Sequence, residues 1–426
     1  MKVVYDISSL GLNPSQANSK RGVFRAVERL ASALQESAEC ELFLCASASF
    51  RQLRLARSHA EQDVQLRSPP FIAPGSELLS SIAFNLDERL SSMGASSNIS
   101  RCRKILRRVL LHTMQLAEHF HTYGETGLPE TGIFHSPFYE LPSPRRLPTR
   151  LKRFLTVYDL IPILAPQFVK YERKPYLQRI LRSIKPNDWV LCISQSTKNE
   201  LCEYLNFDPN RAFVTPLAAA PALFYPCLDQ HRIKAALTRY GINQDPYILS
   251  VTSLEPRKNI EHSIRCFTRL VREQHLDDLQ FVLVGAKAWD YKSILATIAE
   301  CGSIKDRIVL TGHVADQDLA ALYSGALAFV FLSFYEGFGL PPLEAMQCGT
   351  PVITSNTSSL PEVVGNAGIT LNPKDEDGLC SSLLALYEDL SLRKSMSLKS
   401  IEQAANFSWQ KCAKDTIGAY RIALSS

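Results

Sequence analysis

Residues 333–346 read Ser-Phe-Tyr-Glu-Gly-Phe-Gly-Leu-Pro-Pro-Leu-Glu-Ala-Met, with two glycines, two prolines and two glutamates in 14 positions. The apolar run 326–332 comes before this stretch and is long enough for a buried strand. Pro341 and Pro342 stand where a helix can begin, because the missing N–H of proline costs nothing in a first helical turn. The residues therefore predict a strand, a loop and a helix start, which is the repeating unit of an α/β protein.

The loop of this unit is suited to a nucleotide sugar. Gly337 and Gly339 let the backbone turn sharply and come close to a ligand, and the first helical N–H groups then point at an anion. The carboxylates of Glu336 and Glu344 are good acceptors for sugar hydroxyls. We therefore expect backbone amides on a diphosphate, Glu344 on a ribose and Glu336 on the transferred sugar. The spacing of these two glutamates, taken alone, also fits two acidic side chains that are merely exposed to solvent.

The complete string is more specific than its spacing. It resembles the signature of the retaining GT-B glycosyltransferases of family 4, in which Gly-Phe-Gly-Leu-Pro follows the first of two glutamates. The resemblance continues through residues 344–355 (Glu-Ala-Met-Gln-Cys-Gly-Thr-Pro-Val-Ile-Thr-Ser) and 360–368 (Leu-Pro-Glu-Val-Val-Gly-Asn-Ala-Gly). It implies two Rossmann-like domains that face a central cleft, and no cofactor or divalent metal. The donor contacts that it implies in this stretch are Glu336, Gly337, Phe338, Gly339, Leu340 and Glu344.

Two adjacent basic residues follow a predicted strand that begins at Tyr247. Arg257 and Lys258 lie at its carboxyl end, with Asn259 available as a helix cap, so both cations are predicted to face the crevice of the glycine loop. Adjacent cations are often only solvated. In the context Glu-Pro-Arg-Lys-Asn, however, the resemblance implies that they hold the donor diphosphate, whose negative charge grows as it leaves.

The first domain is predicted to begin with a strand at 3–8, a polar loop and a helix. Gly22 is a single glycine in that loop, so an ordinary connection between strand and helix fits as well as a phosphate loop. In family 4 enzymes a glycine loop after the first strand lies near the donor diphosphate. The resemblance therefore makes Gly22 a donor contact, with Lys20 and Arg21 as weaker ones.

Several polar residues follow short apolar runs, at the ends of predicted parallel strands. His135, Tyr158, Asp159 and Ser194 are therefore expected at the rim of a ligand crevice. We expect His135, Tyr158 and Asp159 to contact the acceptor or the sugar, although a histidine in this place is as often structural. Many family 4 enzymes carry His-Asp where this chain has Tyr158-Asp159. Tyrosine cannot carry positive charge near neutral pH, so any role that needs an imidazolium is excluded here. Asp159 is retained, and with Glu336, Arg257 and Lys258 it makes up the predicted catalytic set.

Composition limits the remaining choices. A chain of 426 residues with 46% hydrophobic content can form two domains, which we place at 1–222 and 245–408, with a helix at 409–424 that crosses back to the first. The formal charge of +5 is too small to indicate a nucleic-acid partner. Eleven cysteines without a Cys-x-x-Cys pair, and nine histidines without ligand spacing, predict a reducing compartment and no zinc site.

Residues 101–119 are predicted to form a basic amphipathic helix, with Ile105 and Val109 on one side and Arg103 and Arg107 on the other. This helix could rest on anionic lipid, or it could pack on the protein and leave its cations in water. The sequence shows no apolar run long enough for a signal peptide or a membrane span. We therefore expect a cytoplasmic protein, with peripheral contact at the inner face of the membrane as one interpretation.

Strand and helix signals alternate to the end of the chain, which predicts two doubly wound α/β domains in the GT-B arrangement. The resemblance implies a retaining hexosyltransferase that uses a nucleotide sugar and acts on a glycan or lipid-linked oligosaccharide in surface polysaccharide synthesis. The stretches Tyr-Asp-Leu-Ile-Pro and Leu-Val-Gly-Ala-Lys-Ala-Trp look most like mannosyltransferase-like members, so GDP-mannose is the first choice of donor and a UDP-sugar the second. The alternatives are a catalytically silent sugar-nucleotide sensor or scaffold, and a GT-B sugar-nucleotide epimerase. The linkage and the oligomeric state stay open.

Overall fold

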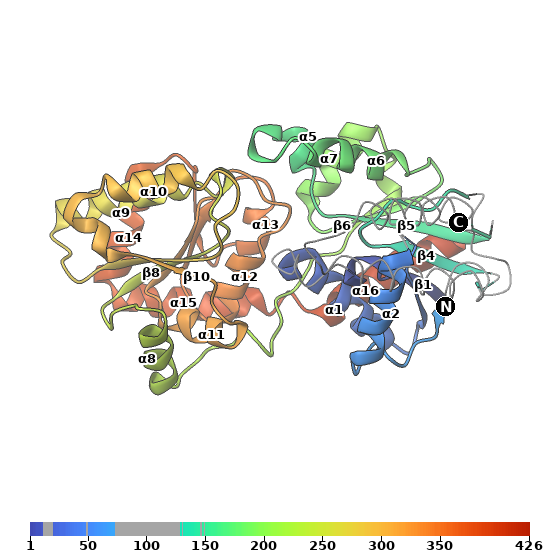
Figure 1. The fold of residues 1–426 in the computed structure, drawn as a ribbon, viewed down its shortest axis with the longest axis horizontal. Coiled ribbons are helices and arrows are strands. Elements are labelled where there is room, and N and C mark those ends of the chain that lie inside the picture. The colour runs from blue at the N-terminus through green and yellow to red at the C-terminus, as the bar shows by residue number, and fades with distance from the viewer. Residues whose placement is uncertain (12–19, 48–49, 73–127, 130, 145–146, 149) are drawn as a thin grey trace, which may run out of the picture.

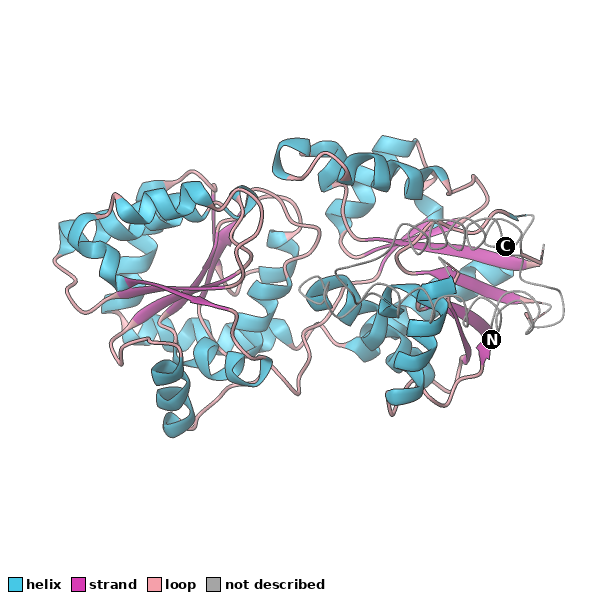
Figure 2. Cartoon of the chain, in the orientation of Figure 1, coloured by secondary structure: helices cyan, strands magenta, loops and turns pink. Residues whose placement is uncertain are grey.

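The computed structural model describes residues 1–11, 20–47, 50–72, 128–129, 131–144, 147–148 and 150–426. Two β-sheets form two lobes, and helices cover both faces of each sheet (Figures 1 and 2). All strand pairs that the described residues form are parallel. The prediction of two doubly wound α/β units is confirmed.

The first sheet has seven strands in the order β3-β2-β1-β4-β5-β6-β7. Its strands are nearly continuous apolar runs, as expected for a sheet that is covered on both faces, and every residue of β4 is buried. The strands are β1 (Lys2–Asp6), β2 (Glu41–Cys45), β3 (Phe71–Ile72), β4 (Gly132–Ser136), β5 (Leu151–Val157), β6 (Trp189–Cys192) and β7 (Ala212–Val214). The helices of this part of the chain are α1 (Arg25–Gln35), α2 (Phe50–Gln62), α5 (Ile161–Leu164), α6 (Arg173–Arg182) and α7 (Gln195–Leu205).

The second sheet has six strands in the order β10-β9-β8-β11-β12-β13. The order turns at β8 and β11, so the loops after these two strands lie side by side, which is where α/β sheets bind ligands. The strands are β8 (Tyr247–Val251), β9 (Gln280–Val284), β10 (Ile308–Gly312), β11 (Ala328–Phe331), β12 (Val352–Ser355) and β13 (Ile369–Leu371). The helices are α8 (Gln230–Arg239), α9 (Ile260–Gln274), α10 (Lys292–Ala299), α11 (Asp316–Gly325), α12 (Leu340–Gln347), α13 (Leu360–Val364), α14 (Glu376–Glu388) and α15 (Leu390–Ala404).

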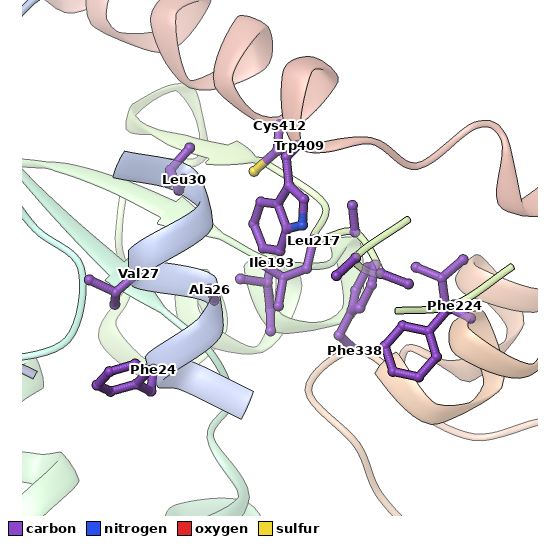
Figure 3. Close-up of a cluster of buried hydrophobic side chains, with 14 of the residues drawn as sticks. Phe24, Ala26, Val27, Leu30, Ile193, Leu217, Phe224, Phe338, Trp409 and Cys412 are labelled. Atoms are coloured by element: carbon purple, nitrogen blue, oxygen red, sulfur yellow. The ribbon is translucent and has the colours of Figure 1, made fainter. Parts of the chain in front are cut away.

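The last helix, α16 (Trp409–Ser425), lies on the first lobe although α15 before it belongs to the second (Figure 1). Tyr420 is completely buried there and meets the ring of Phe154 edge-on, with 4.9 Å between ring centroids. Trp409 and Cys412 of α16 lie beside α1 (Figure 3). The chain therefore passes between the lobes twice, once after β7 and once between α15 and α16.

The segment between the two predicted domains contains α8, which packs with the second lobe. Arg239 Nη1 lies 2.6 Å from Asp318 Oδ2 on α11, and the Tyr240 hydroxyl donates to the same oxygen at 2.8 Å. Among the described helices, none has the length and apolar character that crossing a membrane requires. The predicted basic helix 101–119 lies outside the described residues, so the structure does not test it.

Candidate active site

The turn after β8 carries two cations and is tied to the neighbouring strand. Arg257 and Lys258 lie in a short 3-10 turn, and Asn259 follows in the left-handed conformation at φ 56°. Asparagine tolerates this conformation better than most residues. The Asn259 side chain is buried and donates through Nδ2 to the carbonyls of Leu332 at 3.1 Å and Pro373 at 2.6 Å. The turn is therefore fixed at the carboxyl edge of the second sheet.

The loop after β11 meets this turn through backbone hydrogen bonds. Phe334 N donates to the carbonyl of Arg257 at 2.9 Å, and the Ser333 hydroxyl donates to the same carbonyl at 3.1 Å. Glu336 N donates to the Ser358 hydroxyl, in the loop after β12, at 2.9 Å. The loops that follow β8, β11 and β12 thus form one unit.

Glu336 lies between the two cations. Its Oε1 is 2.5 Å from Lys258 Nζ and 2.8 Å from Arg257 Nη1, and all three side chains are 9–13% exposed. Arg257 also donates through Nη2 to Glu255 at 2.7 Å, and Lys258 Nζ lies 4.8 Å from the centre of the Phe331 ring. The structure brings together the three side chains that sequence analysis placed at the diphosphate and the sugar.

The ion pairs determine the charges of this cluster. Burial acts to raise the pKa of Glu336, but Arg257 and Lys258 outweigh it and hold that pKa at about 2. Burial opposes the charge of Arg257, but Glu336 and Glu255 outweigh it and raise its pKa. Burial, followed by the charge of Arg257, lowers the pKa of Lys258 against the attraction of Glu336. Such a cluster can exchange a carboxylate partner for another anion, because both cations are held in place by the turn.

The glycine loop passes directly against the first lobe. A Cβ at Gly337 would lie 2.2 Å from the carbonyl oxygen of Tyr158 and 2.9 Å from Asp159 Cβ, so only glycine fits at this position. Gly339 has φ 124°, and the buried ring of Phe338 meets Phe407 edge-on at 5.9 Å. The loop therefore lies between the two lobes, with Leu340 as the first residue of α12.

Asp159 faces the cluster from the first lobe. Burial raises the pKa of its carboxyl, whereas the N–H of Ile161, which donates to Oδ1 at 3.0 Å, and the charge of Arg257 lower it. Burial also raises the pKa of the Tyr158 hydroxyl, so this tyrosine is neutral at every physiological pH. Asp159 and the glycine loop thus come together across the lobes.

His135 is not at the rim, and the prediction that it contacts a ligand is wrong. The side chain is 0% exposed, because β4 is covered by α16. Both ring nitrogens are already used: Nδ1 lies 2.6 Å from the Tyr420 hydroxyl and Nε2 lies 2.7 Å from Thr156 Oγ1. Burial lowers the His135 pKa to about 3, so the ring is neutral. Ser194 is also buried and caps α7 by accepting from Thr197 N.

The structure does not place the two other donor candidates, Glu344 and Gly22, in the cation cluster. Glu344, inside α12, accepts from the Tyr323 hydroxyl on α11 at 3.1 Å. Gly22 is exposed in a π-helical turn that leads into α1, and a Cβ there would meet no described atom within 4 Å. The side chains of Lys20 and Arg21 lie outside the described residues.

A cavity of about 690 Å³ lies in the first lobe next to Asp159. Sequence analysis missed most of its wall, since these residues come from five separate segments and no motif joins them. Its polar lining includes the Ser9 hydroxyl, which is buried and has no hydrogen-bond partner among the described residues. The lining residues are Ser9, Val23, Phe24, Phe138, Tyr139, Thr156, Val157, Tyr158, Asp159, Pro162, Arg173, Tyr176, Leu177 and Ile180.

Further contacts join the lobes around the cation cluster. Glu362 of α13 accepts from the backbone N–H groups of Gln195 and Ser196, both at 2.7 Å, at the start of α7. Carboxylates are favourable at this end of a helix. The Tyr335 hydroxyl bonds to Glu200 of α7. These residues were not predicted, because each pair is separated by more than 130 positions.

One Asp-x-Asp sequence of the described residues lies away from the cation cluster. Asp316 and Asp318 form an Asp-x-Asp sequence on α11, but they pair with Arg25 and Arg239. Among the described residues, one group has three potential metal ligands close together, and it lies on α1, α2 and the turn that follows, away from the cation cluster. That group is Glu28, His59 and Asp63.

Comparison with known proteins places this arrangement in a family. Residues 235–403 match the model described as glycosyl transferases group 1. The O-antigen chain mannosyltransferase B of Escherichia coli is 35% identical over 68% of this chain and 74% of its own length. The chain belongs to the group 1 glycosyltransferases. The serotype-specific mannosyltransferase WbdA of Escherichia coli is 30% identical over 65% of this chain, and the match spans only 34% of WbdA.

Solved structures support the fold of this group 1 glycosyltransferase. Sucrose-phosphate synthase from Thermosynechococcus elongatus superposes with a TM-score of 0.66 at 18% identity, covering 100% of this chain and 99% of that one. Anabaena HepE, solved with UDP and glucose, gives a TM-score of 0.63 at 14% identity and covers 98% of both chains. The two lobes are therefore the two domains of the GT-B fold. That the chain is a glycosyltransferase follows from the family match and the mannosyltransferase relatives.

Proposed function

We propose that this glycosyltransferase moves a mannosyl group from GDP-mannose, with retention of configuration and without a divalent metal, to a hydroxyl of a growing surface polysaccharide or lipid-linked oligosaccharide. The observation that carries the proposal is the contact of Arg257 and Lys258 with Glu336, beside Asp159 of the other domain. The O-antigen relatives favour mannose. A UDP-sugar is the second choice of donor, and HepE, solved with UDP, shares the fold.

Arg257 and Lys258 are proposed to hold the donor diphosphate. A bound diphosphate would compete with Glu336 for the same N–H donors, and a displaced Glu336 can accept from hydroxyls of the transferred sugar. As the sugar leaves, negative charge grows on the diphosphate, and two positioned cations stabilise it. Gly22, Glu344 and the amides of Gly337–Leu340 remain proposed donor contacts.

In the proposed step one bond forms, one bond breaks and one proton is transferred. The acceptor oxygen bonds to the anomeric carbon on the face from which the diphosphate departs, and the bond between that carbon and the phosphate oxygen breaks. The acceptor proton passes to a phosphate oxygen, and nucleoside diphosphate is released. Asp159 is proposed to orient the acceptor hydroxyl, since its carboxyl lies where the two domains meet.

The cavity beside Asp159 is the proposed acceptor pocket. Tyr139, Tyr176 and Phe138 supply aromatic faces, on which the C–H groups of a pyranose can pack. Replacing Tyr176 with alanine should raise the acceptor KM and leave donor binding unchanged. Equal acceptor KM values in the wild type and the Tyr176 variant would contradict binding of the acceptor in this pocket.

The deciding experiment follows transfer from radiolabelled GDP-mannose and UDP-glucose by purified protein to mannan oligosaccharides. A preceding thermal-shift screen with GDP, UDP and TDP identifies the nucleotide, because a ligand at a hundred times its dissociation constant adds about 2.7 kcal/mol of stability. Binding without transfer or hydrolysis would favour a silent sensor, and a changed free sugar nucleotide would favour an epimerase.

Peripheral contact with the inner face of the membrane through residues 101–119 is a further part of the proposal. Its support is the basic amphipathic pattern of that segment. The protein should bind vesicles that contain anionic lipid, and charge reversal of Arg103 and Arg107 should abolish this binding. Vesicle binding that survives both reversals would reject the contact.

A further inference from the structure

Three side chains that commonly bind metal ions lie together in the first domain, where α1 lies beside α2 (Figure 1). They are Glu28 on α1, His59 on α2 and Asp63 in the turn that follows α2. One ligand atom of each lies within 4.8 Å of the other two. Sequence analysis did not indicate this group, because Glu28 is 31 positions away from His59.

Contacts with the protein hold two of these side chains in place. His59 Nε2 lies 2.9 Å from Glu28 Oε1, and the ring of Phe24 meets the His59 ring edge-on, with 5.3 Å between ring centroids. Asp63 Oδ1 accepts from two backbone N–H groups of its own turn, at 2.8 and 3.0 Å. Within the described part of the chain, Asp63 Oδ2 accepts no hydrogen bond, so this oxygen is free to bind an ion.

The spacing of the ligand atoms suits one ion. Ligands at adjacent positions of an ion with bonds of about 2.0–2.2 Å lie about 3 Å apart. His59 Nε2 and Glu28 Oε1 already have nearly this separation, at 2.9 Å. The side chains of His59 and Glu28 are 28% and 17% exposed, so a hydrated ion can reach them from solvent. A small rotation of the partly exposed Asp63 side chain brings the third ligand into range.

The charge of the group favours a cation. Two carboxylates lie together here, and neither Glu28 nor Asp63 forms an ion pair with a lysine or arginine among the described residues. The ring of His59 is the one basic partner that the structure gives to Glu28. A divalent ion would therefore balance two negative charges that the protein itself leaves without a permanent positive partner.

The ligand types select the class of ion. Mg²⁺ and Ca²⁺ prefer oxygen ligands alone, whereas Zn²⁺ binds both imidazole nitrogen and carboxylate oxygen. To bind an ion, Nε2 of His59 must present its lone pair, so the proton of a neutral ring lies on Nδ1 and the hydrogen bond to Glu28 is given up. Water completes the coordination, because the side chains are open to solvent.

We propose that Glu28, His59 and Asp63 bind a divalent transition-metal ion, for which Zn²⁺ is the probe. The ion joins α1 to the end of α2 and stabilises the first domain, because an ion that binds only the folded chain favours the folded state. The group is separate from the cation cluster and from the lining of the acceptor pocket. The proposal therefore does not rest on the proposed donor, acceptor or transfer step.

Metal titration of the full chain tests the site. Protein freed of metal by a chelator and kept reduced should bind one Zn²⁺ in a saturable way by calorimetry, and Zn²⁺ should raise its melting temperature. Mg²⁺ at the same concentration should leave that temperature unchanged. Co²⁺ distinguishes these ligands from the eleven cysteines, because thiolates add an intense near-ultraviolet band that nitrogen and oxygen ligands do not give. A thiolate band at one equivalent of Co²⁺ would contradict the proposal.

Variants separate the three side chains from other binding groups. His59→Gln and Asp63→Asn should each weaken Zn²⁺ binding at least about tenfold, since even residues that support a ligand contribute that much. Glu61→Gln on α2 and His231→Gln on α8 change exposed residues outside the group and should bind Zn²⁺ like the wild type. Each variant is compared with its own metal-free melting temperature, so lower intrinsic stability does not obscure the result. Absence of saturable binding by the wild type, or wild-type affinity in both ligand variants, would overturn the proposal.

Discussion

His135 and Glu336 were both predicted to face the same cleft, one from each sheet, but only Glu336 lies there. His135 lies within β4 under α16, where Tyr420 and Thr156 use both ring nitrogens and burial keeps the ring neutral. Glu336 lies in a loop beyond the end of β11, where Arg257 and Lys258 keep it ionised despite burial.

The contrast shows that nearness to the carboxyl end of a parallel strand is not enough to make a functional residue. A side chain inside the strand faces whichever helix covers the sheet, and here that helix is the last one of the chain. A side chain in the loop beyond the strand can reach the other domain. The covering element is distant in sequence, so a local pattern cannot show it.

The largest expected effect is a loss of activity when the cluster of Arg257, Lys258 and Glu336 is changed. Lys258→Ala should lower kcat by a factor that corresponds to about 2.7–4 kcal/mol in the barrier, because it removes one of two positioned partners of the leaving diphosphate. Steady-state kinetics with the identified donor gives the value. Lys305→Ala, at an exposed position of the same domain, is the control. Near-normal turnover by Lys258→Ala would mean that the cluster is structural, as the His135 region is.

Mutations around the neutral, buried His135 should change the stability of the protein and leave its catalytic rate unchanged. Tyr420→Phe leaves His135 Nδ1 without a partner in a completely buried site, which should lower the free energy of unfolding by about 1–3 kcal/mol. Urea denaturation measures the loss, and kcat per folded molecule should be unchanged. Tyr387→Phe removes an exposed contact with Asp278 and should cost within about 0.5 kcal/mol. A drop in kcat without a loss of stability would return His135 to the active site.

The depressed pKa of His135 predicts a dependence of stability on pH. The unfolded histidine binds a proton near pH 6.5 and the folded one only near pH 3, so the stabilisation is complete above 6.5 and is lost as the pH falls toward 3. Between pH 7.5 and 5.5 the wild type should lose about 1.4 kcal/mol more than His135→Gln does. Parallel losses in the two proteins would contradict a neutral, buried imidazole.

The smallest effect is expected at the contact between the domains. Glu362→Gln removes a carboxylate from the start of α7, where it accepts two N–H groups, and should cost about 0.3–1 kcal/mol because the position is exposed. The melting temperature, compared with that of Glu388→Gln in the second domain, gives the difference. A loss above 2 kcal/mol would show that the closed arrangement depends on this one contact.

Much of the fold could be predicted from local patterns. The predicted strand at 3–8, the strand that begins at Tyr247 and the run 326–332 are confirmed as β1, β8 and β11. The apolar runs before His135, Asp159 and Ser194 correspond to β4, β5 and β6, and the alternation of strand and helix continues to the end of the chain. The strands β2, β3, β7 and β13 were missed. Three of them, β3, β7 and β13, have only two or three residues. So short an apolar run becomes a strand only through its neighbour in the sheet, as Ile72 does beside Cys45.

The candidate site was predictable to the extent that single loops carry it. Arg257, Lys258 and Glu336 come from two continuous stretches, and the structure brings them into contact. The wall of the acceptor pocket is assembled from five segments of the first domain. Pairs such as Tyr335 with Glu200 form only where the two domains meet. Their residue types have no spacing that could have indicated them.

Calorimetric titration of GDP into the wild type, Lys258→Ala and Glu336→Gln tests the central claim, that a diphosphate binds the cations now held by Glu336. We predict weaker binding by Lys258→Ala, and binding by Glu336→Gln that equals or exceeds that of the wild type, because the competing carboxylate is gone. Wild-type affinity in Lys258→Ala, together with lost binding in Glu336→Gln, would contradict the claim.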